Sequence, residues 1–440
     1  MSAKILGDSG VLYTDRRDFY IDPQVVKELW TDVAPFTTVV SNRETRATND
    51  PVFKMFEHRN PWVKQSITLG TCTAGSGSLD VLADGTFFSL ANASNPATAI
   101  ASAANLDDPA TNPLSFEGLI VDVATSAGVQ KGKAIMVHNG TVLGLKNLGS
   151  VFAVATGDVM TVIGNAHGEG TDSPDAWADE LKTVWNSTQI FKTPLEITGT
   201  LLQASLRGES SELSRLRDQK NQEHKMQKEK SFLFGVRVGG TNLDGSGSFA
   251  DGGRTDGNSK LVRTTYGIVS AIEDFGNSSG DDQNKFTISE ASYTYSNFVD
   301  DMEKVFQYVP ENGVKRAFVG AGALGYWSKL GGTGGLAGNS SWTVNLGDMK
   351  RDSLGFNYRV LETPHGMLQL IPTPALRGAY NKTMLVVEDS NMFHAQYRSP
   401  MFQANIKTEN AYDGVKDQYF SDEGIGISLI ESHSLFSITP

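Results

Sequence analysis

The segment L-R-G-E-S-S-E-L-S-R-L-R-D-Q-K-N-Q-E-H-K-M-Q-K-E-K-S-F-L-F-G, residues 206–235, predicts a single long helix. It has no proline and one glycine near its start, and an apolar Phe-Leu-Phe cluster at its end. A helix of roughly 28 residues is about 42 Å long. Because so polar a helix gains little stability from propensity alone, it needs neighbours along its length. Two interpretations are open here: a strut that contacts partners through charge, or an exposed helix that connects two domains.

Extended strands are predicted before this helix. The stretch P-V-F-K-M-F-E-H-R, residues 51–59, alternates so that one face carries Val52, Lys54, Phe56 and His58. A second extended run, N-S-T-Q-I-F-K-T-P-L-E-I-T-G-T, covers residues 186–200. Pro194 within it indicates an edge strand or a free-standing hairpin arm, because proline cannot donate to a sheet ladder.

A β-rich module is predicted between these two strands, over residues 67–165. Its early part is dominated by Ala, Ser, Gly, Thr and Asn. Farther on, G-K-A-I-M-V-H (132–138) and T-V-L-G-L-K (141–146) flank Asn139-Gly140, which fits the two positive-φ positions of a type I′ turn. The module is therefore expected to be all-β.

The chain after the helix alternates between element types, which predicts an α+β fold overall. A glycine-rich loop at 239–260 precedes L-V-R-T-T-Y-G-I-V-S-A-I (261–272), which predicts a strand. Ser289 and Glu290 open a predicted helix that runs to about residue 309. A hairpin is expected from 356–362 and 367–372, and three or four more strands from 383 to 440.

Composition excludes several classes of protein. The 440 residues carry a formal net charge of −12, which argues against nucleic-acid binding as the main activity. The N-terminus lacks the apolar segment of a signal peptide, and no apolar run approaches the length of about 18 residues that a membrane helix needs. Cys72 is the single cysteine, so an intrachain disulfide and a multi-cysteine metal site are excluded. We expect a soluble product of a reducing compartment.

The motif that best matches a chemical site is G-A-G-A-L-G, with Gly320, Gly322 and Gly325 after a strand and at the start of a helix. A dinucleotide fingerprint needs that context, but also repeated βαβ units and a suitably placed acidic residue, which are missing here. A tight strand-to-helix turn explains the glycines. Asp244, Asp251 and Asp256 fit no calcium-loop spacing. The seven histidines show no metal-ligand spacing, so we expect no catalytic, cofactor or metal site.

The order of elements, together with several stretches, resembles one known family. The stretches are A-P-F-T-T-V-V-S-N-R-E-T-R-A-T-N-D-P-V-F-K-M-F-E (34–57), V-I-G-N-A-H-G-E-G-T-D-S-P (162–174) and the run at 186–200, with weaker likeness at 226–235 and 412–424. They resemble the major capsid proteins of tailed bacteriophages, which have the Hong Kong 97-type fold. None of these stretches is a chemical motif.

The resemblance implies a division of the chain. Residues 1–50 are the expected N-terminal arm, and 51–66 with 186–200 the two strands of the extended E-loop, on which 67–165 is an insertion. Residues 201–261 are the expected peripheral domain with its spine helix at 206–235, 262–385 the axial domain, and 386–440 a return to the peripheral sheet. The chain lacks a long helical scaffolding segment before the arm, and no Lys–Asn–Glu trio for cross-linking can be placed.

An assembly surface is expected along the spine helix and the E-loop strands. Mixed charges there can set the register between copies even when each exposed pair contributes under about 1 kcal/mol. On the helix the candidates are Arg207, Glu209, Glu212, Arg215, Arg217, Asp218, Lys220, Glu223, Lys225 and Lys228, with Glu229 beside them. On the strands they are Lys54, Phe56, Gln189, Phe191 and Lys192.

The resemblance implies a structural subunit of an icosahedral head that forms hexamers and pentamers around double-stranded DNA. Other copies of the chain are the main expected partners, with portal, scaffolding and decoration proteins beside them, weak contact with DNA and no membrane. Synthesis and assembly are expected in the host cytoplasm, and the virion capsid is the final location. Two alternatives stay open: the shell of a cellular nanocompartment, and a dinucleotide-binding enzyme that uses Gly320–Gly325.

Overall fold

The computed structural model describes residues 34–58, 66–68, 78–82, 86–89, 118–139, 142–155, 157–172, 181–204, 211–238, 254–257, 260–279, 283–308, 313–330, 349–351, 357–406 and 413–439. Two compact units divide the chain. Unit 1 is Met1–Glu57 with Thr183–Pro440, and unit 2 is His58–Lys182. Most of the predicted N-terminal arm and most of the glycine loop at 239–260 lie outside the described residues.

The predicted long helix is α4, Glu212–Phe234. The Ser211 hydroxyl accepts a hydrogen bond from the backbone N–H of Ser214 and caps the first turn, and Gly235 ends the helix. Its 23 residues make it about 34 Å long. The first part of the prediction, 206–210, lies outside the described residues, and the interface candidates Arg207 and Glu209 lie there with it.

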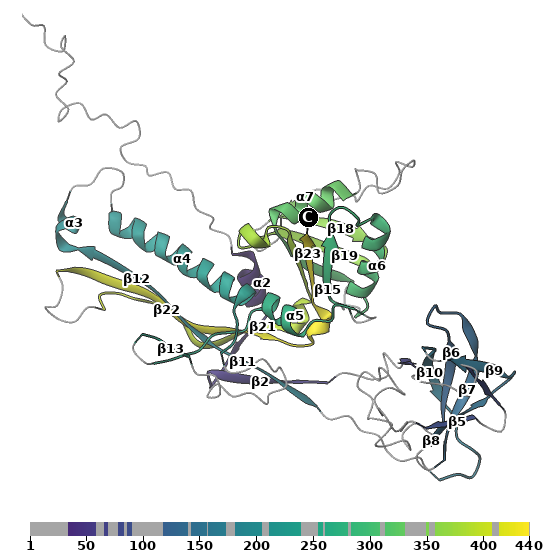
Figure 1. Cartoon of the computed structure of the whole chain (residues 1–440). Coiled ribbons are helices and arrows are strands. Elements are labelled where there is room, and N and C mark those ends of the chain that lie inside the picture. Colours follow the sequence, from purple (N-terminus) through teal and green to yellow (C-terminus); the bar gives the residue numbers. More distant parts are fainter. Residues whose placement is uncertain are drawn as a thin grey trace, which may run out of the picture. The chain divides into compact units, whose positions relative to one another are not determined.

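A four-stranded sheet packs against α4 (Figure 1). Its order is β1 (Thr45–Ala47), β21 (Met392–Gln403), β22 (Gly414–Ile427) and β12 (Gln189–Thr198), and a short helix α3 (Gly199–Gln203) follows β12. β1 runs parallel to β21, and the other pairs are antiparallel. β12 is an edge strand, which confirms the prediction from Pro194.

The pairing of the two strands expected to form the extended loop differs from the expectation. β2 (Val52–Glu57) pairs with β11 (Lys182–Ser187), whereas the expected partner, 189–198, belongs to the four-stranded sheet as β12. The two strands β11 and β12 are separated at Thr188, whose N–H donates to Pro51 O over 2.8 Å. Beyond Thr188 every second residue of β12 is buried, so this run belongs to the core beneath α4 and cannot stand free.

A seven-stranded mixed sheet forms the second part of unit 1. Its order is β15 (Lys285–Ser289), β23 (Ser434–Thr439), β20 (Thr383–Val387), β16 (Val314–Val319), β19 (Gly366–Pro372), β18 (Asn357–Thr363) and β17 (Lys350–Arg351). Helices α6 (Tyr295–Val305) and α7 (Ala321–Leu330) share a core with one face. The other face shares a core with α4, α5 (Ile268–Phe275) and α2 (Pro35–Arg43).

Alternation along the central strands explains this two-sided burial. On β16, Ala317 and Val319 belong to the α6–α7 core, and Phe318 between them belongs to the α4 core. On β20, Val386 faces the first core while Leu385 and Val387 face the second. A strand that is buried on both faces needs apolar residues at consecutive positions, and Ala317–Val319 of β16 and Met384–Val387 of β20 are such runs.

Three expectations for unit 1 were wrong in detail. The stretch 261–272 is not one strand: β14 (Leu261–Val262) pairs with β13 (Arg254–Thr255), and the apolar run that follows is the buried helix α5. The last strand, β23, joins the seven-stranded sheet rather than the four-stranded sheet that contains β21 and β22. Helix α6 begins after Thr294, whose hydroxyl caps it, and not at Ser289. The predicted hairpin at 356–372 is confirmed as β18 and β19.

In the part of unit 2 that the structure describes, the regular secondary-structure elements are all strands. A six-stranded antiparallel sheet has the order β3 (Ser66–Thr68), β10 (Val159–Asn165), β6 (Leu119–Ala124), β7 (Gln130–Asn139), β8 (Val142–Asn147) and β5 (Thr86–Ser89). β4 (Ser78–Val81) pairs with β9 (Phe152–Ala155). The β7–β8 pairing confirms the predicted hairpin, with Asn139 opposite Val142. Unit 2 has a hydrophobic core of its own, built from residues such as Val121, Met136 and Val154.

Candidate functional site

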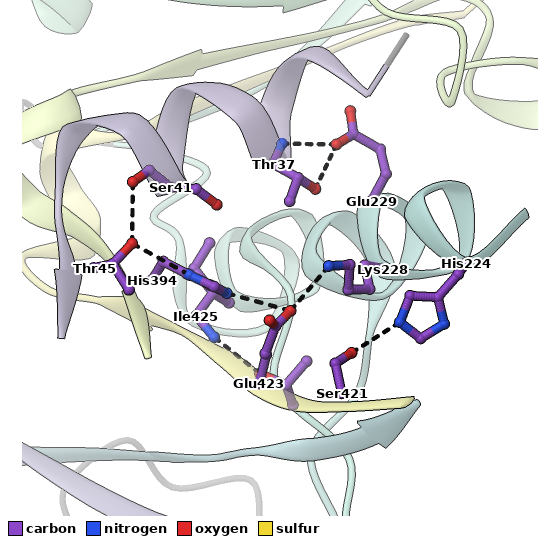
Figure 2. Close-up of polar contacts among 11 residues, drawn as sticks. Thr37, Ser41, Thr45, His224, Lys228, Glu229, His394, Ser421, Glu423 and Ile425 are labelled. Atoms are coloured by element: carbon purple, nitrogen blue, oxygen red, sulfur yellow. Dashed lines mark hydrogen bonds and ion pairs between the residues drawn. The ribbon is translucent and has the colours of Figure 1, made fainter. Parts of the chain in front are cut away.

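The charged side of α4 faces the subunit's own sheet. The Arg217 guanidinium donates from Nε and Nη2 to Asp417 Oδ2 on β22, over 2.9 and 2.7 Å. Farther along, Lys228 Nζ lies 3.1 Å from Glu423 Oε2 (Figure 2). The side chains of Asp417 and Glu423 are fully buried. Two of the helix cations expected at an assembly surface therefore have partners within the subunit.

The spacing of helix and strand explains why these contacts recur. Asp417, Ser421 and Glu423 lie on one face of β22, because alternate residues of a strand share a face. Six strand residues span about 20 Å. The helix partners are Arg217, His224 and Lys228, and eleven helix residues span about 16 Å. The two rows run in the same chain direction and nearly match in length, so each helix side chain meets its own strand residue.

His224 lies in the middle of this row. Its Nε2 is 3.0 Å from Ser421 Oγ, and its Nδ1 is 3.0 Å from Thr193 Oγ1 on β12. Burial and, after it, the positive charge of Lys228 lower the pKa of His224 to about 4, although Glu423 opposes the shift. The imidazole is therefore neutral at pH 7, and it joins α4 to two strands through hydroxyl groups.

Glu423 is a buried carboxylate shared by two elements. Beside Lys228, it lies 3.5 Å from His394 Nε2, and His394 Nδ1 lies 3.4 Å from Thr45 Oγ1 (Figure 2). Burial acts to raise the pKa of Glu423, but His394 and Lys228 outweigh it and hold the pKa below its ordinary value. The carboxylate is thus ionised and connects α4, β21 and, through His394, β1.

Glu229 makes a different contact, with the first turn of α2. Its Oε1 accepts from the backbone N–H of Phe36 over 3.0 Å. Its Oε2 accepts from the backbone N–H and the hydroxyl of Thr37, each over 2.7 Å (Figure 2). Ala34 at the N-cap of α2 offers no side-chain oxygen, so a carboxylate from α4 caps the helix instead. Burial raises the pKa of Glu229, and the hydrogen bonds from Thr37 and Phe36 oppose the rise.

The opposite face of β22 is held by arginines. Asp422 is fully buried, and its Oδ2 accepts from Arg263 Nη2 over 2.9 Å and from Arg398 Nη2 over 3.1 Å. The Arg398 guanidinium also lies 4.4 Å from the centre of the Phe420 ring. Asp422 and Glu423 are consecutive in β22, and each is paired with different cations: Asp422 with two arginines and Glu423 with Lys228.

The strand pair of β2 and β11 is called the two-stranded arm from here on, and its root is buried in unit 1. Phe53 of β2 packs against Phe393, with ring centres 5.9 Å apart. On β11, the Asn186 amide donates to Tyr266 O and Ile425 O, and the Arg237 guanidinium lies 3.6 Å from the Trp185 ring centre. Lys54 and Phe56, on the other face of β2, are exposed, and Phe56 is 75% exposed. The face pattern predicted for 51–59 is confirmed.

The remaining interface candidates fall into three groups. Phe191 is buried against Phe232, and Gln189 donates to Ser231 Oγ over 3.4 Å, so both contribute to the core beneath α4. Two ion pairs lie within the helix, Arg215 with Glu212 and Lys220 with Glu223. Three candidates are exposed: Asp218, Lys225 and Lys192.

The acidic partners of α4 were missed by sequence reasoning. Asp417 and Glu423 lie in the stretch 412–424, whose sequence indicated only a likeness to other proteins. A usable signal was present: a strand pattern with two acids on one face, opposite a helix with cations at matching intervals. Glu229 was counted among the charges of the long helix. Its role as a cap for α2 leaves no local sequence signal, because Glu229 and Phe36 are far apart in the chain.

The glycine motif at the start of α7 is occupied by the protein itself. Asn381 Oδ1 accepts from the Gly322 N–H over 3.0 Å, and Asn381 O accepts from the Ala323 N–H over 3.0 Å. A Cβ on Gly320 or Gly322 would collide with Asn381. The N–H groups that a phosphate would need are therefore already used. The glycines allow close packing, which removes the basis of the dinucleotide alternative.

Among the described residues, no group of three or more His, Cys, Asp or Glu side chains could hold a metal ion. Within that same part of the chain, no helix is both long and apolar enough to cross a membrane. The buried charges described above pair across elements of the fold, so they hold the fold of the subunit together.

The class of the protein follows from comparison with known proteins. The sequence profile of the SU10 major capsid protein family matches residues 31–425. The chain belongs to the SU10 major capsid protein family. It is therefore a structural, non-enzymatic subunit of the phage head, its location is the virion capsid, and it assembles with copies of itself. Its fold is the mixed α/β fold described above.

Similar solved structures come from several particles. The capsid of a native GTA particle matches with 8% identity over 98% of this chain and 97% of the other, at a TM-score of 0.40. Mycobacterium phage Patience matches with 12% identity over 63% and 76%, at 0.39. The capsid of cyanophage P-SCSP1u matches with 10% identity over 62% and 80%, at 0.34. No curated protein sequence matches.

Proposed function

We propose that this subunit builds the head from hexamers and pentamers in which the arm formed by β2 and β11 reaches a neighbouring copy. One observation carries the proposal: Phe56 is 75% exposed on a strand whose opposite face is packed into unit 1. A large aromatic side chain left in water at such a place is typical of a surface that is buried on association. Lys54 on the same face would supply charge at the edge of that contact.

The form of the arm supports this role. A two-stranded sheet is marginally stable by itself, so the arm depends on its root. The root is well held: Trp185, Asn186, Ser187 and Thr188 are all buried. A strand pair with a fixed root and an exposed aromatic residue can deliver that residue to a defined place on another copy. In the terms of the capsid fold, β2 and β11 are the proposed E-loop strands.

Unit 2 is the proposed insertion on this loop. It lies in the chain between β2 and β11, which pair with each other, and it has a core of its own. We infer that a short linker in place of residues 59–181 leaves a foldable unit 1. Size-exclusion chromatography and circular dichroism of that deletion test the inference: a folded, soluble subunit supports it, and insoluble protein contradicts it.

The remaining domain and partner assignments extend the proposal. Residues 1–50 serve as an N-terminal arm, 201–261 with β21 and β22 as the peripheral domain, and the seven-stranded sheet as the axial domain. A separate scaffolding protein, a portal and decoration proteins are proposed partners. The net charge of −12 favours weak contact with packaged double-stranded DNA, because like charges repel.

Expression of the full chain with and without a scaffolding protein tests the assembly proposal. We expect closed particles with five-fold and six-fold clusters in electron micrographs. Charge at Asp218, Lys225 and Lys192 is exposed and available to set the register between copies. A protein that stays monomeric in analytical ultracentrifugation under both conditions would refute the proposal.

A further inference from the structure

The four-stranded and the seven-stranded sheet of unit 1 contribute to one core, and α2 belongs to it. Only two direct strand-to-strand connections in the described part of the chain join the sheets: 388–391 between β20 and β21, and 428–433 between β22 and β23. Both are short, and each contains a single 3₁₀ turn. Short connections of this kind are where an angle between two sheets changes with least loss of packing.

Apolar residues of α2 contact both sheets at this junction. Phe36, Val39 and Val40 are buried in the core that also contains Phe318 and Leu385 of the seven-stranded sheet. The Phe36 and Phe318 rings meet edge to face with centres 5.1 Å apart. The same core contains Phe191 of β12 and Ile425 and Ile427 of β22. The helix also contacts the 388–391 connection directly.

The segment after α2 attaches to the other sheet by a weaker contact. β1 has three residues, all exposed, and pairs in parallel with one edge of β21. Its Thr45 hydroxyl lies 3.4 Å from His394 Nδ1. A pairing of three residues at the edge of a sheet contributes little to the stability of this attachment. The position of α2 therefore depends on its apolar face and on the cap that Glu229 provides.

We propose that α2, residues 35–43, is a wedge that sets the angle between the two sheets, and that Glu229 holds the wedge in place. The inference deepens the proposed function, because the angle between the two parts of a subunit sets the curvature of a shell. Glu229 suits the task because it is fully buried and all its hydrogen bonds described above go to the first turn of α2. Replacing one of its two carboxyl oxygens weakens three contacts at one helix terminus.

The first test measures hydrogen exchange in the unassembled full-length chain. In Glu229→Gln, the backbone amides of residues 36–43 should exchange about tenfold faster, because the Gln side chain keeps one acceptor oxygen and turns an NH2 donor toward the donors of the helix terminus. Glu303→Gln makes the same chemical change at an exposed position of α6 and should leave that exchange unchanged. If Glu229→Gln does not fold, Thr37→Val removes only the hydroxyl contact and should speed the exchange of the α2 amides about threefold. Unchanged exchange in the folded variants overturns the role of Glu229.

The second test measures the angle between the sheets. Spin labels at Lys192→Cys on β12 and Glu362→Cys on β18, in a Cys72→Ser background, report the distance between the sheets without any need for assembly. Glu229→Gln should broaden the distance distribution, and Glu303→Gln should not. Faster exchange in α2 with an unchanged distribution would overturn the wedge.

The third test connects the wedge to the shell. Particles of Glu229→Gln should vary more in diameter than wild-type particles in cryo-electron micrographs, and those of Glu303→Gln should not. Equal diameters in all three would overturn the link to curvature. If the wild-type chain forms no particles, the assembly proposal fails, while the exchange and distance measurements still decide whether α2 is a wedge.

Discussion

Helix α4 is highly charged and strand β2 is rich in aromatic residues, but neither is placed as its composition suggests. α4 is the most charged helix of the described chain, yet Glu229 and His224 are buried and Arg217 and Lys228 pair with buried acids. β2 is rich in aromatic residues, yet Phe56 stands in water. The helix therefore uses charge to fix the fold within one copy, whereas the strand keeps an apolar group free for a second copy. Polarity alone does not tell which surface a shell subunit offers its neighbours.

The buried pair beneath α4 gives the largest expected effect. Lys228→Met leaves Glu423 buried without its main cation and should lower the free energy of unfolding by about 3–5 kcal/mol. The double variant Lys228→Met with Glu423→Leu should recover most of that loss, because neither charge then remains buried. Urea unfolding of the unassembled subunit measures both. Lys225→Met, at an exposed position on the same helix, is the control. A loss of less than about 1 kcal/mol would show that the pair is not needed.

Acid should weaken α4 through His224. Its pKa is about 4 in the fold against an ordinary value of 6.5, so the unfolded chain binds the proton more readily. The stability is fully present above pH 6.5 and is lost as the pH falls toward 4. Between pH 7 and pH 5 the loss from this group is about 2 kcal/mol.

His224→Gln should reduce the difference in unfolding free energy between pH 7 and pH 5 by about that amount. His433, buried with a pKa of about 3, contributes a similar acid sensitivity that the variant keeps. An identical pH dependence in the variant and the wild type would contradict the role of His224.

The exposed aromatic residue on β2 should affect assembly rather than folding. Phe56→Ser should change the free energy of unfolding by less than about 0.5 kcal/mol, because the side chain is already in water. The protein concentration needed for assembly should rise about tenfold, as expected for the loss of one buried aromatic contact. Light scattering measures that threshold. Leu261→Ser, which removes an apolar side chain that is 60% exposed on β14, is the matched control.

The smallest effect is expected from an ion pair on the outside of α4. Glu223→Gln breaks the pair with Lys220, in which both side chains are about one-third exposed. Such pairs one helical turn apart contribute under about 0.5 kcal/mol. The unfolding midpoint in urea should therefore barely move at low salt and not at all at high salt. A larger loss would place Glu223 with the buried charges rather than with the surface ones.

Some of this architecture follows from the sequence, because it rests on local patterns. The residues of α4 are a run of helix formers between a serine cap and a glycine, and the β7–β8 and β18–β19 hairpins have turn signals between alternating strands. The edge position of β12 follows from Pro194. The alternation that exposes Phe56 was also readable, since residues of one strand face share a period of two.

Other features depend on contacts between distant residues and have no local signal. The apolar run Ile268–Ile272 forms a strand or a buried helix with equal ease, and packing beneath α4 decides for the helix. Glu229 reads as one more surface charge until Phe36 and Thr37 are placed beside it. The partner of β2 was mistaken for the same reason: β11 and β12 are adjacent in sequence, and only the break at Thr188 separates their sheets.

The position of β23 has a consequence for how the subunit is made. This strand lies between β15, its parallel neighbour, and β20, its antiparallel neighbour. During synthesis the ribosome delivers β15, β16, β19 and β20 long before β23, so the sheet has a vacant interior place until residues 434–439 emerge. Phe436 and Ile438, which close one of the two cores, arrive with them. A translation product that stops short of β23 therefore exposes an open strand edge and an incomplete core, and quality control can remove it before it enters a shell.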